Sequence, residues 1–187
     1  MITVDNLSLV IKKEISIIFL LISSVTCFSQ DLPNPEFAGR PYFIKDNSLV
    51  NFERADGVLS ATAGMKGMVT FYGVPASKSD VRFSSSSLPI IFIRVDAGVD
   101  PVEVFSIVRA DIGKKGREFI VRKTDRRNAV QDMSDILVKF SFTKKADGIY
   151  ELKFDNGITP GEYAIISSTE TGGGTSLKSK ISCFGID

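Results

Sequence analysis

The stretch that decides the fold is ILVKFSFTKKADGIYELKF (residues 136–154), in which apolar and polar side chains alternate. Phe140 and Phe142 are each followed by a polar residue, and Leu152 and Phe154 repeat the pattern after a KKADG turn signal. Successive side chains of a strand point to opposite faces of the sheet, so this period indicates two half-buried β-strands. We therefore expect an antiparallel hairpin that buries these four apolar side chains together.

The rest of the chain also favours strands over helices. Two segments, PIIFIRV (89–95) and GEYAIIS (161–167), have consecutive apolar residues, which predicts central strands covered on both faces. Further strands are expected in RPYFI (40–44), SLVNFER (48–54), MVTFYG (68–73), PVEVFSIVRA (101–110), EFIVRK (118–123) and SKISCFG (179–185). A segment with a helical spacing, DRRNAVQDMSDIL (125–137), is expected to be a single short turn or a loop.

About ten short strands joined by short loops predict an all-β fold, either an antiparallel β-sandwich or a barrel, with at most one short helix. The stretch ITPGEYAI (158–165) resembles the x-P-G-x-Y corner of immunoglobulin-like and prealbumin-like sandwiches, with Pro160, Gly161 and Tyr163 in the matching places. The resemblance implies that Pro-Gly turns the chain into a late strand and that the tyrosine packs under it. It concerns the fold and not the function.

The amino terminus has the pattern of a secretory signal peptide. Two lysines, Lys12 and Lys13, precede a short apolar run at residues 15–22, and small polar residues follow it. The run is too short to span a membrane as a helix. We expect cleavage before Gln30, which divides the chain into a signal peptide (residues 1–29) and a single all-β domain (residues 30–187) without a membrane span.

Two alternatives to a cleaved signal peptide remain open. Cys27 could be the acylated first residue of a lipoprotein, although Ser24 and Thr26 depart from the usual lipoprotein box. The apolar run could also stay as an uncleaved anchor. In each case the protein is exported and works in the periplasm, at the cell surface or outside the cell.

Composition excludes several functions. The chain has 23 basic and 22 acidic residues, and removal of residues 1–29 takes two of each, so the net charge stays +1. This balance argues against nucleic acid as a partner. The chain has no histidine, which excludes His-dependent triads and weakens the case for zinc, and we expect no metal and no cofactor. Cys183, the one thiol outside the signal peptide, is expected to be a buried small side chain.

The most distinctive charged segment is KKGREFIVRKTDRR (114–127), with seven basic and two acidic residues. Such a segment can hold the carboxylates or phosphates of an anionic ligand. The candidate ligand-binding residues are Lys114, Lys115, Arg117, Arg122, Arg126 and Arg127. Adjacent side chains of a strand diverge, so the loops at the two ends of the segment would have to form the site. The alternative is a solvated hairpin without a ligand.

Three functions follow from these features. The first is a noncatalytic binding module of the cell envelope or exterior, with an envelope glycan, such as an anionic one, or a protein as partner. The second is a structural or assembly subunit of an envelope complex, paired through an exposed edge strand at residues 179–185. The third is a hydrolase that uses two carboxylates, for which the sequence nominates no particular pair.

Overall fold

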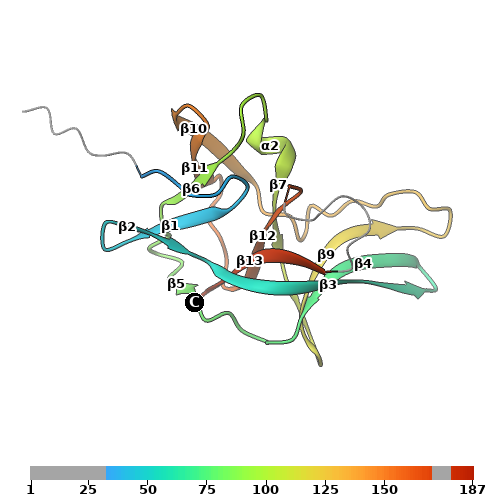
Figure 1. Cartoon of the computed structure of the whole chain (residues 1–187). Coiled ribbons are helices and arrows are strands. Elements are labelled where there is room, and N and C mark those ends of the chain that lie inside the picture. The colour runs from blue at the N-terminus through green and yellow to red at the C-terminus, as the bar shows by residue number, and fades with distance from the viewer. Residues whose placement is uncertain (1–32, 170–177) are drawn as a thin grey trace, which may run out of the picture. The chain divides into compact units, whose positions relative to one another are not determined.

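The structure is a computed structural model that describes residues 33–169 and 178–187, which belong to one compact unit (Figure 1). The predicted signal peptide and Cys27 lie outside the described residues. Within the described part, no helix has the length and apolar character needed to cross a membrane. The fold is all-β with two sheets, as the alternating pattern predicts, and it contains thirteen strands and one short helix in these residues.

The smaller sheet has five antiparallel strands. Their spatial order is β10 (Phe140–Ala146), β11 (Ile149–Phe154), β6 (Ile91–Arg94), β1 (Pro41–Lys45) and β2 (Ser48–Asn51). The predicted hairpin is confirmed as β10 and β11, with Phe140 opposite Phe154 and Phe142 opposite Leu152. The prediction that 89–95 forms a central strand is also confirmed, because β6 lies between β11 and β1.

The larger sheet has eight strands, and its main path is antiparallel. The order is β7 (Phe105–Arg109), β12 (Gly161–Ser167), β13 (Lys178–Ile186), β3 (Glu53–Gly64), β4 (Gly67–Val74), β9 (Gly116–Thr124) and β8 (Asp111–Gly113). A short strand, β5 (Arg82–Phe83), adds to β13 in parallel. As predicted for 161–167, β12 is a central strand.

One predicted strand divides between the two sheets. The segment 48–54 was expected to be continuous, but β2 ends at Asn51 and β3 begins at Glu53 in the other sheet. The residue between them, Phe52, is buried between the sheets, where its ring packs edge-on against Phe43 at a centroid distance of 5.1 Å. Burial of Phe52 thus fixes the point at which the chain passes from one sheet to the other.

A second predicted strand begins as a helical turn. The segment 101–110 was expected to be a strand throughout, but Pro101–Val104 forms the short helix α2 before β7. The Asp100 carboxylate caps this turn by accepting a hydrogen bond of 2.9 Å from the Val102 N–H. An aspartate cap followed by proline is a helix-start signal, and here it overrides the strand propensity of the valines.

The carboxy-terminal strand is not an edge. The assembly hypothesis placed an exposed edge at 179–185, but β13 is hydrogen-bonded to β12 on one side and to β3 on the other. Both neighbours occupy its backbone groups, so an added strand has no place there. Cys183 of this strand is fully buried, as predicted.

Both faces of the larger sheet bury apolar side chains. One face packs on the smaller sheet and contributes Ile107, Ile165 and Phe184 to the core between the sheets. The other face forms a second core from strands of the larger sheet alone, with Tyr72, Phe119, Val108, Ala164, Ile166, Ile181 and Cys183 among its members. The larger sheet therefore curls around its own interior, and β7 and β9, far apart in the strand order, come into contact.

The segment 125–137 connects these two sides of the curled sheet. It contains turns but no helix, as predicted. At its start Val130 forms a bridge with Thr124 at the end of β9, and at its end Leu137 forms a bridge with Val108 of β7. The Arg109 N–H also donates to the Ile136 carbonyl at 2.9 Å. The segment thus forms backbone hydrogen bonds with β9 on one side of the curled sheet and with β7 on the other.

The expected corner is present at residues 159–163. Gly161 begins β12, directly after Pro160, and Tyr163 is 1% exposed beneath the turn. Its hydroxyl donates a hydrogen bond of 2.7 Å to the Thr159 carbonyl, the backward bond that defines a tyrosine corner. Its ring stacks on Phe184 at a centroid distance of 5.5 Å.

Candidate functional site

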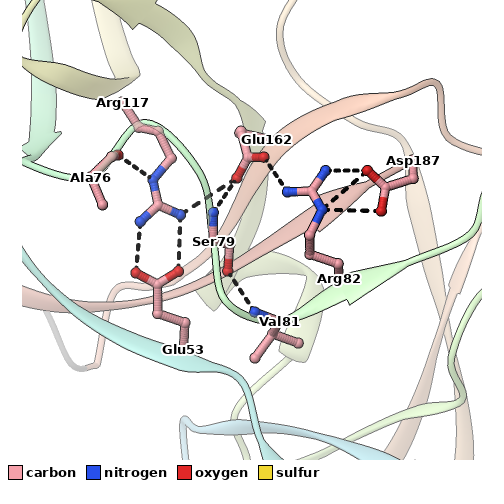
Figure 2. A network of polar contacts seen from close by, with 8 residues as sticks. All are labelled: Glu53, Ala76, Ser79, Val81, Arg82, Arg117, Glu162 and Asp187. Carbon is pink, nitrogen blue, oxygen red and sulfur yellow. Dashed lines mark hydrogen bonds and ion pairs between the residues drawn. The ribbon is translucent and has the colours of Figure 1, made fainter.

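The densest gathering of charge lies at one end of the second core, around Arg117 of β9. Arg117 is fully buried, and its guanidinium forms a bidentate pair with Glu53 of β3, at 3.0 and 2.6 Å (Figure 2). Its Nε donates a third hydrogen bond of 2.9 Å to the carbonyl of Ala76. All three guanidinium nitrogens of Arg117 therefore have partners.

Glu162 of β12 extends this network. One carboxylate oxygen lies 3.6 Å from Arg117 and accepts a hydrogen bond of 2.8 Å from the Ser79 N–H. The other oxygen accepts a hydrogen bond of 2.6 Å from Arg82. Arg82 in turn reaches both carboxylate oxygens of Asp187 through its Nε, at 3.1 and 3.0 Å (Figure 2). The five charged side chains form one continuous chain of contacts.

A glycine makes room for the outer half of the network. Gly185 of β13 lies opposite Glu162 in the strand register. A Cβ atom at this position would come within 2.3 Å of the Arg82 Nη1 and 2.9 Å of the Glu162 Oε1. Any larger residue would push the Arg82 guanidinium away from its carboxylate, so the close approach of Arg82 and Glu162 depends on Gly185.

The charges of the network are fixed by their surroundings. Burial is the largest single influence on Glu53 and opposes its ionisation, but the hydrogen bonds from Arg117, Ser79 and Asp80 and the charge of Arg117 together outweigh it and hold the pKa of Glu53 below its usual value. Burial is likewise the largest influence on Arg117 and opposes its charge, but the hydrogen bonds to Glu53 and the surrounding negative charges together outweigh it, so the pKa of Arg117 is raised. Burial raises the pKa of the nearby Cys183 to about 12, which keeps this thiol protonated and unreactive.

These contacts give the network a structural role. Residues 75–81 connect β4 to β5, and two of their backbone groups, the Ala76 carbonyl and the Ser79 N–H, are held by Arg117 and Glu162. The network therefore ties this connection to β3, β9 and β12. Every guanidinium nitrogen of Arg117 and both carboxylate oxygens of Glu162 have partners within the fold. The structure therefore places Arg117, one of the candidate ligand-binding residues, inside the molecule and apart from the exposed basic side chains.

The remaining basic candidates divide between the two ends of β9. Lys114 and Lys115 are exposed in the turn between β8 and β9, whereas Arg126 and Arg127 are exposed in the turn that follows β9. Arg122 is exposed near this second end. The nine residues of β9 separate the two turns by about 26 Å at a usual rise per residue. The structure therefore does not bring the six candidates together as one patch.

The end of β9 that carries Lys114 and Lys115 borders a groove of about 540 Å³. The groove runs over the outward face of β3, β4 and β9, where Ser60, Thr62 and Phe71 line it. Within the described residues, no ion pair engages Lys114 or Lys115. The groove thus combines two ammonium groups, two hydroxyl groups and one aromatic ring, and it is the candidate ligand-binding site.

Gly73 keeps the floor of the groove open. An added Cβ at Gly73 would meet only the Phe71 ring at 3.7 Å and the Val58 carbonyl at 3.9 Å, which are ordinary contact distances. A side chain at this position would therefore occupy the groove without straining the sheet. Glu118 also lines the groove and is its one carboxylate among the lining residues.

Sequence reasoning identified the two lysines of the groove but not Ser60, Thr62, Phe71 or Gly73. A signal was available for Phe71: it precedes Tyr72 in a predicted strand, so one of the two rings had to face away from the other. The structure buries Tyr72 in the second core and turns Phe71 outward. The hydroxyl residues gave no signal, because their position depends on the pairing of β3 with β4.

Metal-ligating side chains do not gather in the parts of the chain that the structure describes. Asp111 of β8 and Glu118 of β9 lie opposite each other in the strand register, but Asp111 does not line the groove. No group of three or more Cys, Asp or Glu side chains there is arranged to hold a metal ion. Glu53 and Glu162 are brought together, but both are tied to Arg117. A comparison with known proteins finds no matching family model, no matching curated protein and no matching solved structure. Function therefore rests on the geometry of the groove.

Proposed function

We propose that the protein is an exported, noncatalytic binding module that holds an anionic glycan in the groove beside Lys114 and Lys115. The observation that carries this proposal is the pair of exposed lysines, without an ion pair among the described residues, next to the outward-facing ring of Phe71. The proposed place of action is the cell envelope or the exterior, which rests on the signal-peptide pattern of residues 1–29.

The groove offers the contacts that an acidic sugar needs. Ammonium groups form charge-assisted hydrogen bonds with carboxylates or sulfates, which are about twice as strong as neutral ones. The hydroxyls of Ser60 and Thr62 can exchange hydrogen bonds with sugar hydroxyls. The Phe71 ring supplies the flat apolar surface on which the carbon-bound hydrogens of a sugar ring can pack. An open, solvated groove of this kind suits a polymer that enters from one side and continues past the site.

The other two functions have less support. The edge strand suggested for an assembly subunit, residues 179–185, is β13, and this strand is central. The carboxylate hydrolase needs two carboxyl groups about 5–10 Å apart at a cleft. The groove contributes Glu118 alone, and the neighbouring pair of Glu53 and Glu162 serves the ion network.

The proposal is tested by calorimetric titration of the full chain with oligogalacturonate and, in parallel, with neutral dextran oligomers. We expect saturable binding of the uronate that weakens with added salt, and no binding of dextran. Gly73→Val, which fills the groove without changing any charge, should weaken the uronate binding by tenfold or more. Equal binding of both polymers, or full affinity of Gly73→Val, would contradict a charged-glycan site in this groove.

A further inference from the structure

A second surface lies at the opposite end of β9. The turn between β3 and β4 carries Met65 and Lys66, and it lies beside the turn that follows β9 (Figure 1). The two turns are joined by a hydrogen bond that the Arg126 Nε donates to the Met65 carbonyl. Lateral pairing continues the connection, because Met68 lies opposite Thr124 and Thr124 lies opposite Val130. We call this joined pair of turns, with Met68 and Val130 beside them, the tip.

Large apolar side chains of the tip are exposed to solvent. Met65 is 83% exposed, Val130 is 68% exposed and Met68 is 38% exposed. Residues opposite each other in a sheet share a face, so Met68 and Val130 flank Thr124 on the same side. Neither of the two cores includes these three side chains. Because these side chains remain exposed to solvent, they contribute little buried apolar surface to the stability of the sheet.

The same tip carries unbalanced positive charge. Lys66, Arg126 and Arg127 are exposed, and in the described part of the chain none of them takes part in an ion pair. The turn also contains one carboxylate, Asp125, beside Arg126 in the sequence, and the three basic residues outnumber it. It accepts hydrogen bonds of 2.7 and 2.9 Å from the backbone N–H groups of Arg127 and Ala129.

We infer that the tip docks on an anionic lipid surface, with Met65, Met68 and Val130 entering the interfacial region and Lys66, Arg126 and Arg127 contacting the headgroups. Stable attachment to a bilayer usually needs two contributions, apolar insertion and electrostatic attraction. Three basic residues at the surface strengthen binding by about fivefold each. The exposed methionines and the valine distinguish this site from the groove, where hydroxyl groups lie beside the lysines and the proposed ligand is a soluble polymer. The inference does not rest on glycan binding.

A vesicle co-sedimentation assay on the full chain tests the inference. The probes are vesicles of phosphatidylcholine mixed with phosphatidylglycerol, and vesicles of phosphatidylcholine alone. We expect binding to the anionic vesicles only. The triple variant Lys66→Gln/Arg126→Gln/Arg127→Gln should bind about 100-fold more weakly. The double variant Met65→Ser/Val130→Ser, which keeps every charge, should bind about tenfold more weakly.

A matched control removes three charges elsewhere. Lys139→Gln/Lys144→Gln/Lys153→Gln changes the net charge equally, on or beside β10 and β11 of the smaller sheet, and should reduce vesicle binding by about twofold or less. Three results would overturn the inference: no binding to anionic vesicles, equal binding to neutral vesicles, or an equal loss in both triple variants. Capture of a soluble protein by the tip in the absence of vesicle binding would likewise overturn it. Loss of oligogalacturonate binding would not bear on it.

Discussion

Three basic residues within four positions, Lys114, Lys115 and Arg117, differ completely in their surroundings. The two lysines lie in the turn between β8 and β9 and are open to solvent. Arg117, two positions after Lys115 in the sequence, is fully buried. Gly116 separates them with a φ of 130°, and a Cβ there would lie 2.0 Å from the Val74 carbonyl. This sharp change of direction sends the next side chain into the interior.

The difference shows that the local sequence does not determine whether a basic side chain is buried in an ion pair or exposed to solvent. Arg117 donates a hydrogen bond to Glu53, which lies 64 residues earlier in the sequence, and this contact holds β9 and β3 together. Lys114 and Lys115 form no ion pair within the described residues and are open to solvent. A buried charge without its partner is costly, whereas an exposed charge without a partner is solvated by water. The two regions should therefore respond in opposite ways to the same kind of substitution.

The largest expected effect is on stability, from Arg117→Met. This variant leaves the Glu53 carboxylate and the inner oxygen of Glu162 without their buried cation, so it should lower the free energy of unfolding by about 3–5 kcal/mol. Urea unfolding followed by circular dichroism measures the change. Lys114→Met, three positions earlier and also a loss of one positive charge, should change it by about 0.5 kcal/mol or less. Similar losses of unfolding free energy in the two variants would contradict the different roles of Arg117 and Lys114.

The next effect concerns pH. The pKa of Glu53 is lowered in the folded state, so its contribution to stability is present above its unfolded value near 4.5 and is lost as the pH falls through the folded value. We expect Glu53→Gln to cost about 2 kcal/mol at neutral pH and to flatten the loss of stability below about pH 4.5. Unfolding curves collected from neutral to acid pH measure both. An unaltered acid slope in the variant would show that Arg117 does not hold this carboxylate as an anion.

A smaller effect is expected at the outer end of the network. Gly185→Ala places a methyl group against Arg82 and Glu162, and the flexible Arg82 side chain should move away. Because Arg82 is partly exposed, the lost ion pair should cost about 1 kcal/mol. Thermal unfolding of Gly185→Ala and of the double variant Gly185→Ala/Arg82→Gln measures this. If Arg82 is what the methyl group displaces, the second substitution adds little to the first.

The sequence predicted the parts of the fold that depend on local pattern. Alternation predicted the β10–β11 hairpin and the shared face of its apolar side chains, uninterrupted apolar runs predicted β6 and β12 in the middle of their sheets, and a short motif predicted the corner at Tyr163. Each of these features is set by side chains close together in the chain. The split at Phe52 and the central position of β13 depend on pairing between distant strands, which the pattern does not contain.

The candidate site was predictable only in part for the same reason. The basic composition of 114–127 identified Lys114 and Lys115, but also Arg117, because a sequence does not show which face of a strand is enclosed. Because the larger sheet curls on itself, one face of β9 lies inside the molecule, and Arg117 and Phe119 are buried there. Phe71 and Gly73 joined the lysines only through the pairing of β4 with β9.

The proposed function places the anionic ligand at the exposed end of β9, beside Lys114 and Lys115. Calorimetric titrations with oligogalacturonate compare two double variants that lose the same charge, Lys114→Met/Lys115→Met and Arg126→Met/Arg127→Met. We expect the affinity to fall by tenfold or more in the first and by about twofold or less in the second, because Arg126 and Arg127 lie about 26 Å away. Equal losses of affinity in both, or a larger loss in the second, would show that the groove is not the binding site.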